Sequence, residues 1–295
     1  MIRQKGHKIL VFGAYGLLGG SLSLYLRNNL PESKLYLHGS SSFAEITIEF
    51  KHTNLHQIAE LVNYIQPTTI INLIAKTDVD ACELDPDHAY FLNAQIVQSI
   101  ATAAQDVDSY FIHISTDQIY SGPGPSVEAN VNPINVYSAS KLQGDSYASI
   151  AKSCILRTNF CGKSLNNTRK SFSDWLISNS HTRCTYTLFD DIIFSPLSIS
   201  ALCELILDIT LQNNLLGVFN AGSSNGISKA DFGSQLVSKM RLDNSLYTIT
   251  PFSSNNLIAN RPFDMTMDSS LLSKMMNWNP PSMNATIESI VKDYC

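Results

Sequence analysis

The first half of the chain alternates between short runs of consecutive apolar residues and longer segments whose apolar residues recur every three or four positions. The apolar runs predict buried strands, and the helical spacing predicts helices that pack against them. The predicted strands are 8–12, 34–37, 69–75 and 110–115, and the predicted helices are 17–30, 56–65 and 86–104. Strands that alternate with helices favour a parallel sheet covered on both faces.

The second half is less regular. It predicts two more buried strands, at 154–158 and 217–220, and helices at 171–178, 199–211, 229–239 and close to the end. We therefore expect an α/β protein with a doubly wound parallel sheet and a smaller, discontinuous C-terminal lobe. The expected division is 1–158 for the sheet domain, with 192–220 returning to it, and 159–191 and 221–295 for the lobe that binds the substrate.

Three glycines follow the first predicted strand and open the first predicted helix. Gly13, Gly16 and Gly19 have the spacing Gly-x-x-Gly-x-x-Gly, a variant of the dinucleotide-binding motif. In a Rossmann-type sheet such glycines allow a tight turn, the approach of a pyrophosphate to the backbone, and close packing of helix on strand. A glycine-rich turn without a ligand is the alternative, but the strand and helix on either side favour dinucleotide binding.

The second predicted strand ends without the acidic residue that normally binds the adenosine ribose. The sequence there is "LYLHGSSS", and Gly39 occupies the position where an acid is expected. Ser40, Ser41 and Ser42 can donate hydrogen bonds to a 2′-phosphate, and no carboxylate repels it. This pattern favours NADPH over NADH, although a plain polar loop explains it equally well.

Composition excludes several classes of protein. The chain is 44% hydrophobic, which excludes a disordered protein, and its net charge of −5 argues against a dedicated nucleic-acid binder. No apolar stretch approaches the ~20 residues of a membrane span. None of the six cysteines forms a Cys-x-x-Cys pair, so we expect free thiols, no zinc site and a cytoplasmic location.

A hydroxyl, a phenol and an ammonium follow the fourth predicted strand. "HISTDQIYSG" brings Ser115, Thr116 and Asp117 to the carboxyl edge of the sheet, where ligands bind in open α/β folds. Tyr137 and Lys141 come 21 and 25 residues after Thr116, four apart at the start of a predicted helix. A Tyr-x-x-x-Lys pair alone is weak evidence, because many helices contain one by chance.

Several motifs together resemble the extended short-chain dehydrogenase/reductases, and within them the dTDP-4-dehydrorhamnose reductase family. They are the glycine motif, "NLIAKTDVDACELDP", "STDQIY", "NVYSASK" and "NRPFDMTMD", in that order along the chain. The resemblance implies a Rossmann-type fold, an NAD(P)H-dependent sugar-nucleotide reductase and a catalytic Thr116–Tyr137–Lys141 triad. It also implies that Lys141 binds the nicotinamide ribose.

The resemblance also implies two sets of binding residues. The expected cofactor contacts are Gly13, Tyr15, Gly16, Leu17, Leu18, Gly19, His38, Gly39, Ser40, Ser41, Ala75, Lys76, Thr77, Asn93, Tyr137 and Lys141. The expected substrate contacts are Val79, Ser115, Asp117, Gln118, Phe160 and Arg261. No metal is expected, and a homodimer is a possible assembly.

The tyrosine and lysine also predict a specific electrostatic effect. A free tyrosine has a pKa of ~10, and a cation ~4 Å away contributes roughly 4 kcal/mol at an effective dielectric of ~20. We therefore expect Lys141 to lower the pKa of Tyr137 toward neutrality, less any cost of burying the phenol. Tyr137 then donates a proton to a reduced carbonyl, and Thr116 orients that oxygen.

Two short stretches separate this chain from related reactions. Sugar-nucleotide dehydratases carry an Asp-Glu pair after the threonine, whereas this chain has Asp117 and Gln118, and a glutamine is neither acid nor base. The chain also departs from the reductase family at Phe160 and at 189–196, so the sugar need not be the rhamnose precursor. An epimerase, an epimerase-reductase, or a non-catalytic subunit like that of methionine adenosyltransferase remain alternatives.

Other polar residues have structural interpretations. The acidic run of Asp78, Asp80, Glu83 and Asp85 predicts a helix-capping region rather than a metal site. His113 alternates with apolar residues on a strand, which is typical of a structural histidine.

Overall fold

A computed structural model describes residues 6–39, 48–49, 54–166, 169–252 and 257–295. Among these residues, seven parallel strands form one sheet in the order β11-β6-β5-β4-β1-β2-β3. The strands are β1 Lys8–Phe12, β2 Lys34–Gly39, β3 Ile48–Glu49, β4 Thr69–Asn72, β5 Tyr110–Thr116, β6 Ser153–Thr158 and β11 Gly217–Ala221. This is a Rossmann-type α/β fold, as predicted. The strand order reverses between β1 and β4, and the carboxyl edge of the sheet at such a reversal is where ligands bind in open α/β folds.

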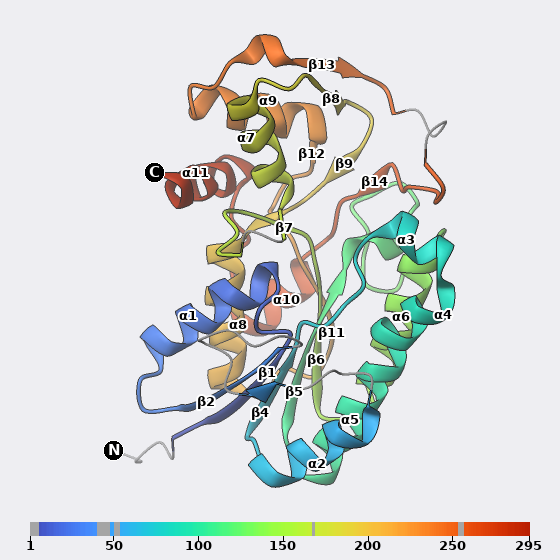
Figure 1. Ribbon diagram of the computed structural model, residues 1–295, viewed down its shortest axis with the longest axis vertical. Helices are drawn as coiled ribbons and strands as arrows, with labels where there is room; N and C mark the ends of the chain where they lie inside the picture. Colours follow the sequence, from blue (N-terminus) through green and yellow to red (C-terminus); the bar gives the residue numbers. More distant parts are fainter. Residues whose placement is uncertain (1–5, 40–47, 50–53, 167–168, 253–256) are drawn as a thin grey trace.

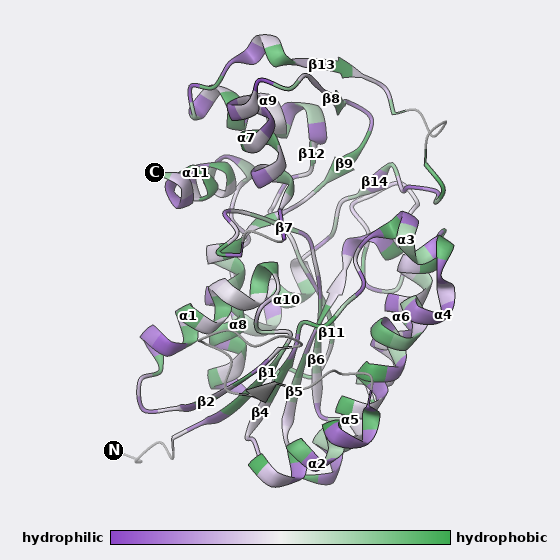
Figure 2. Ribbon diagram, in the orientation of Figure 1, coloured by the Kyte–Doolittle hydropathy of each residue, from purple (hydrophilic) through white to green (hydrophobic). Residues whose placement is uncertain are grey.

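Helices cover both faces of the sheet (Figure 1). One face carries α1 Leu17–Asn29, α8 Ile199–Gln212 and α10 Ser270–Met276, and the other carries α2 Leu55–Ile65, α5 Ile96–Asp106 and α6 Val136–Ala148. Side chains alternate along β1: Ile9 and Val11 pack under α1 and α8, whereas Leu10 and Phe12 pack under α2 and α5. Figure 2 shows hydrophobic and hydrophilic residues mixed along each covering helix, as expected for helices buried on one side.

The long helix predicted at 86–104 is interrupted. It consists of α4 Pro86–Tyr90, a π-helical turn η1 Phe91–Gln95, and α5. The π turn packs directly on α6, because a Cβ added at Gly144 would lie only 2.1 Å from the carbonyl oxygen of Asn93. Helix α6 therefore approaches η1 backbone to backbone.

A smaller lobe sits beyond the carboxyl edge of the sheet (Figure 1). Its helices are α7 Phe172–Thr182, α9 Lys229–Lys239 and α11 Met283–Tyr294. Its strands are β7 Phe160–Cys161, β8 Tyr186–Phe189, β9 Ile193–Phe194, β10 Leu197–Ser198, β12 Ile227–Ser228, β13 Tyr247–Thr250 and β14 Asp264–Met265. A separate hydrophobic cluster around Phe194, Phe232 and Ile287 holds the lobe together. The strands β7–β10 and β12–β14 were not predicted, since most are two residues long.

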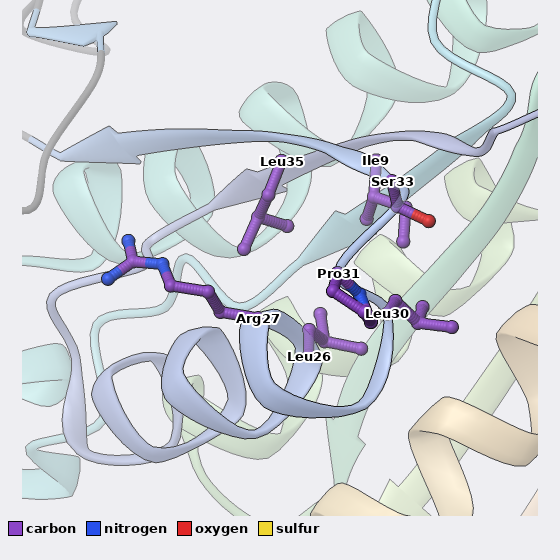
Figure 3. Close-up of a pocket in the computed structure, with 7 residues that line it drawn as sticks. All are labelled: Ile9, Leu26, Arg27, Leu30, Pro31, Ser33 and Leu35. Carbon is purple, nitrogen blue, oxygen red and sulfur yellow. The ribbon is translucent and has the colours of Figure 1, made fainter.

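A hollow at the C-terminal end of α1 is not a candidate site. It has a volume of about 200 Å³ and lies between Leu26, Arg27 and Pro31 on one side and Leu35 on the other (Figure 3). Arg27 points out from it, and the other labelled side chains are apolar apart from Ser33. Within the described parts of the chain, no helix combines the length and apolarity needed to cross a bilayer.

Candidate active site

The glycine motif forms the turn that joins β1 to α1. Gly13 has a φ of 78°, in the left-handed region, and a Cβ there would lie 3.0 Å from the carbonyl carbon of Leu73. A Cβ at Gly19 would lie 2.2 Å from the carbonyl oxygen of Gly13. Both positions therefore require glycine, one for the turn and one for the close packing of α1 on it.

The start of α1 is arranged to accept an anion. Gly16 is the N-cap residue, and among the described residues no side chain caps this helix end and no acid lies in its first turn. The first amide groups of the helix are therefore available to an anionic group at this end. Leu18 is buried in the core and Leu17 packs against it, so both fix the helix rather than line an open surface. The turn and the helix start fit the pyrophosphate of a dinucleotide.

One hydrogen bond joins this turn to the small lobe. The side-chain amide of Asn166, which follows β7, donates to the main-chain carbonyl of Tyr15 at 2.7 Å. The glycine turn is thus hydrogen-bonded to a residue 151 positions away in the chain.

The end of β2 lies beside the turn. The main-chain carbonyl of His38 accepts a hydrogen bond from the amide of Ala14 at 3.0 Å, and its buried ring lies 5.1 Å from the ring of Phe12. Gly39 ends the strand. Ser40 and Ser41 fall outside the described residues, so their assignment as cofactor contacts stays a prediction.

Asn93 holds the loop that contains Ala75, Lys76 and Thr77. Its side-chain oxygen accepts from the amide of Lys76 at 2.8 Å, and its Nδ2 donates to the carbonyl of Lys76 at 3.1 Å and to Ser140 Oγ at 3.0 Å. Asn93 is fully buried within the π turn. Through these hydrogen bonds Asn93 joins the loop of 75–77 to α6. π turns are frequent at functional sites.

The structure brings Thr116, Tyr137 and Lys141 together. Thr116 ends β5, and the other two occupy one face of α6, which begins with a capping box between Asn135 and Ser138. All three side chains are at least nine-tenths buried. The Thr116 hydroxyl donates to Asp117 Oδ1 at 3.3 Å, and it lies near enough to the Tyr137 phenol to lower the pKa of that phenol. A phenol and a hydroxyl thus lie close together at the carboxyl edge of the sheet.

The expected electrostatic effect of Lys141 on Tyr137 was wrong for this structure. Burial raises the pKa of Tyr137 above its usual value of 10.0, and the nearby Thr116 hydroxyl opposes this only in part. The ammonium of Lys141 donates to the carbonyl oxygen of Ile114 at 2.8 Å. Burial also lowers the pKa of Lys141 to about 8, against the opposing effect of Asp145. Desolvation therefore outweighs the attraction that sequence spacing alone predicts.

Asp117 and Gln118 follow Thr116 in a short 3₁₀ turn, η2 Asp117–Ile119. Asp117 is buried and accepts a hydrogen bond from Asn159 Nδ2 at 2.8 Å, yet burial still raises its pKa to about 6. The backbone amide of Gln118 donates to Thr116 Oγ1 at 3.2 Å, which fixes the rotamer of the threonine. Phe160 is partly buried against the sheet core at the base of the lobe.

The other predicted substrate contacts lie at different depths. Val79 packs in a small cluster with Tyr137 and Ala259. Ser115 is buried, and its hydroxyl faces the carboxylate of Asp145 rather than the lobe. Arg261 pairs with Asp80 and also donates to the carbonyl of Ala259. The substrate roles of these residues stay predictions.

The acidic run of 78–85 caps helices, as predicted. Asp78 caps α3 Val79–Leu84 and Asp85 caps α4, each by accepting from a backbone amide three residues on. Asp80 accepts from the amide of Ala259 at 3.0 Å, and Glu83 accepts from the amide of Val136 at 2.8 Å. The run therefore joins α3 to the start of α6 and to the segment that carries Arg261.

One cation near Asp117, Lys229, has no signal in the sequence. Lys229 begins α9, and its ammonium lies 5.7 Å from the centre of the Phe172 ring. Burial lowers the pKa of Lys229, and the charge of Asp117 opposes that effect. Nothing in "ISKADF" marks this lysine, because a charged residue in a first helical turn is ordinary; only the fold brings it toward Asp117.

A Rossmann-type sheet, a glycine turn at its first strand and a Thr–Tyr–Lys constellation at the ends of β5 and α6 define an extended short-chain dehydrogenase/reductase. Residues 7–295 match the model of the family described as "RmlD substrate binding domain". The chain belongs to this family.

Known relatives agree. The dTDP-4-dehydrorhamnose reductase of Shigella flexneri is 35% identical over 165 residues, which cover 54% of this chain and 53% of that protein. That match spans only about half of the length of the curated relative. A probable low-salt glycan biosynthesis reductase of Haloferax volcanii is 26% identical over 96% of this chain and 98% of its own. The crystal structure of dTDP-4-dehydrorhamnose reductase from Bacillus anthracis with NADP superposes with a TM-score of 0.84, at 26% identity and coverage of 97% and 98%.

Proposed function

We propose that this protein reduces a keto group, at the 4-position, of a nucleotide-linked deoxy sugar with NADPH. The observation that carries the proposal is the meeting of Thr116, at the end of β5, with Tyr137 and Lys141, on one buried face of α6, at the carboxyl edge of the sheet. The three residues lie at the edge where the glycine turn and the open start of α1 are also found. Membership of the RmlD family and the NADP in the Bacillus anthracis relative support the same reaction class.

The roles of the residues follow from their positions. When bound, NADPH supplies the hydride. Tyr137 donates a proton to the carbonyl oxygen of the sugar, and its raised pKa keeps it protonated until the oxygen gains negative charge. Thr116 donates a hydrogen bond to the same oxygen, and its own position is fixed by the amide of Gln118. Lys141 supplies a positive charge beneath the phenol and binds the ribose beside the nicotinamide.

The glycine turn, with Gly13, Gly16 and the first amides of α1, is the binding site for the pyrophosphate of NADPH. The end of β2 near His38 and Gly39 receives the adenosine ribose, and β2 itself carries no acid that would repel a 2′-phosphate. NADH remains a slower alternative donor. The small lobe built around α7, α9 and α11 binds the nucleotide sugar, with Phe160, Arg261 and Lys229 as its contacts. A cytoplasmic homodimer stays a prediction.

Turnover tests the proposal directly. Purified protein is incubated with NADPH and a panel of 4-keto and 3-keto nucleotide sugars, and oxidation of NADPH is followed with product analysis. Reduction of a 4-keto sugar without added protein partners is expected. Products epimerised without net oxidation of NADPH would instead establish an epimerase. Absence of turnover across the panel, together with a stable complex with a second enzyme, would establish a non-catalytic subunit.

A further inference from the structure

A buried polar cluster lies behind the catalytic lysine. Its members come from three elements: His113 and Ser115 on β5, Lys141 and Asp145 on α6, and Arg157 on β6. None of the five is more than 5% exposed. Because Tyr137, Lys141 and Asp145 are spaced four apart, they follow one another down the buried face of α6. Asp145 is thus the next side chain inward from Lys141.

The hydrogen bonds around His113 fix its tautomer. The side-chain oxygen of Asn72 accepts from the amide of Ile74 at 3.1 Å, so the amide nitrogen of Asn72 faces His113 Nδ1, also at 3.1 Å. Nδ1 must therefore be the acceptor, and the proton resides on Nε2. Burial and the charge of Lys141 both lower the pKa of His113, which keeps the ring neutral. The Nε2–H group lies 3.8 Å from Asp145 Oδ1.

The carboxylate of Asp145 is surrounded by donors. Arg157 Nε donates to Oδ2 at 2.9 Å, and Arg157 is itself held by the Tyr120 hydroxyl and by the carbonyl of Glu128. Ser115 faces the carboxylate closely enough to favour its charged form. Oδ1 forms no direct hydrogen bond of ordinary geometry with the described residues and lies 3.8 Å from His113 Nε2, so its interactions are electrostatic. Lys141 is four residues before Asp145 on the same buried helix face, and the carboxylate raises its pKa.

We propose that Asp145 is a positioning residue of the active site: a buried carboxylate, held by Arg157 and one helical turn along α6 from Lys141, that keeps Lys141 charged and directed at the Ile114 carbonyl. A buried ammonium is unstable unless a carboxylate lies near it. Asp145 is the carboxylate that opposes the effect of burial on the pKa of Lys141. The catalytic consequence of this inference rests on the proposed function, whereas the electrostatic consequence does not.

The other ionisable groups near Lys141 do not replace Asp145. They are Tyr137 on α6, His113 on β5 and Arg157 on β6; Cys82 on α3 and Asp117 in η2 act on the Tyr137 phenol, whereas Asp145 is the charge that acts on Lys141. The tyrosine, the cysteine and the histidine are neutral near pH 7, because burial raises the pKa of the first two and lowers that of the third. Arg157 is a cation, so it adds no attraction for Lys141.

The test measures the titration of Lys141 itself. The protein is produced with ¹³Cε-labelled lysine, the Lys141 resonance is assigned by its loss in Lys141→Met, and its shift is followed against pH. The wild type should titrate near pH 8. In Asp145→Asn the midpoint should fall by about one pH unit or more, a tenfold loss in proton affinity. Asp145→Glu should restore most of it, and Asp293→Asn, at a partly buried carboxylate in the small lobe, should leave it unchanged. An unchanged midpoint in folded Asp145→Asn overturns the proposal.

Asp145→Asn leaves Arg157 buried without a counter-ion, so this variant has a risk of misfolding. The double variant Asp145→Asn/Arg157→Met removes both charges, and Lys141 should again titrate below its wild-type midpoint. Kinetics supply the second readout: the loss of kcat/KM at high pH should move to lower pH together with the NMR midpoint. If no sugar is reduced by any variant, the proposed function fails, yet the titration still decides the role of Asp145. If kcat/KM keeps its wild-type pH profile while the NMR midpoint falls, the positioning role is wrong.

Discussion

The guanidinium of Arg261 lies 3.0 Å from the carboxylate of Asp80, which joins the segment after 257 to α3 at the rim of the site. The same carboxylate accepts from the amide of Ala259, and hydrogen bonds from this segment lower the pKa of Asp80. Arg261 is therefore already engaged within the chain. The ammonium of Lys229, by contrast, lies over the Phe172 ring on the lobe side of Asp117.

The two cations should thus differ in their effect on substrate binding. Lys229→Met should raise KM for the sugar nucleotide about tenfold or more, because a hydrogen bond to a charged group contributes ~1.5–3 kcal/mol.

Arg261→Ala should also raise KM and leave NADPH binding unchanged. Asp80→Asn tests whether Arg261 contacts the substrate or only anchors its own segment to α3. If Asp80→Asn raises KM as much as Arg261→Ala does, the arginine acts by anchoring the segment after 257. Arg183→Ala, at an exposed arginine paired with Asp243, is the control. Weakened NADPH binding in Arg261→Ala would place this arginine outside the substrate site.

Gly16→Val should weaken NADPH binding more than tenfold, above ~1.4 kcal/mol, with the fold retained. A Cβ at Gly16 would lie 3.3 Å from the Gly13 carbonyl, which the turn can accommodate, but a branched side chain would occupy the place of the pyrophosphate. Fluorescence titration with NADPH measures the effect. Gly20→Ala, one turn further along α1, should bind normally because its Cβ would meet only Leu165 at 3.7 Å. Equal affinities for both variants would exclude the glycine turn from cofactor binding.

Replacing Gly39 with Asp should shift the preference of the enzyme from NADPH toward NADH. The added carboxylate can bind the ribose hydroxyls, and it repels a 2′-phosphate. The ratio of kcat/KM for the two cofactors is the measurement. Gly122→Asp, where a Cβ would meet nothing within 4 Å, adds the same charge elsewhere and should leave the ratio unchanged. A wild type that strongly prefers NADH would contradict this prediction but not the reductase activity.

Tyr137→Phe should lower kcat by at least about two decades, because general acid catalysis contributes typically 10²–10⁴-fold. Lys141→Met should cause a similar loss and also weaken NADPH binding. Thr116→Val should cost less, roughly 0.5–1.5 kcal/mol, since only an orienting hydrogen bond is lost. Tyr147→Phe, near the end of the same helix, should be silent. Wild-type rates in purified Tyr137→Phe would mean that another group supplies the proton. Because the three residues serve the same proton transfer, their effects should not add in double variants.

Asp117→Asn should stabilise the protein above pH 6 and not below pH 4. The pKa of Asp117 is about 6 in the fold against an ordinary 3.8, so the folded state holds this proton more tightly than the unfolded state. Stability therefore falls as pH rises between these values, by on the order of 3 kcal/mol at most. Thermal unfolding at pH 4 and pH 8 measures the difference. Asp108→Asn, at an exposed carboxylate, should give the same small change at both pH values. A gain for Asp117→Asn that does not depend on pH would exclude titration as its cause.

The sheet could be predicted, and so could the meeting of Thr116, Tyr137 and Lys141 at its edge, because both depend on short local sequence patterns. Apolar runs mark β1, β5 and β6, and Thr116, Tyr137 and Lys141 lie in short motifs with fixed spacing. The direction of the Lys141 ammonium could not be predicted, because it depends on Asp145 and on the degree of burial, which only the packed structure sets. The π turn around Asn93 was missed because its apolar periodicity reads as one continuous helix. Lys229 was missed because its relation to Asp117 spans more than a hundred residues of chain.

The hydrogen bond from Asn166 to the carbonyl of Tyr15 links the glycine turn between β1 and α1 to the small lobe. A ligand that orders the glycine turn should also restrict Asn166 at the start of the lobe. The first ligand to bind then bears the entropic cost of this ordering, and the second ligand does not bear it again. By reciprocity, the cofactor should then strengthen sugar-nucleotide binding by the same factor by which the sugar nucleotide strengthens cofactor binding. A side chain that contacts neither reacting atom would in this way couple the two binding sites, whichever ligand enters first.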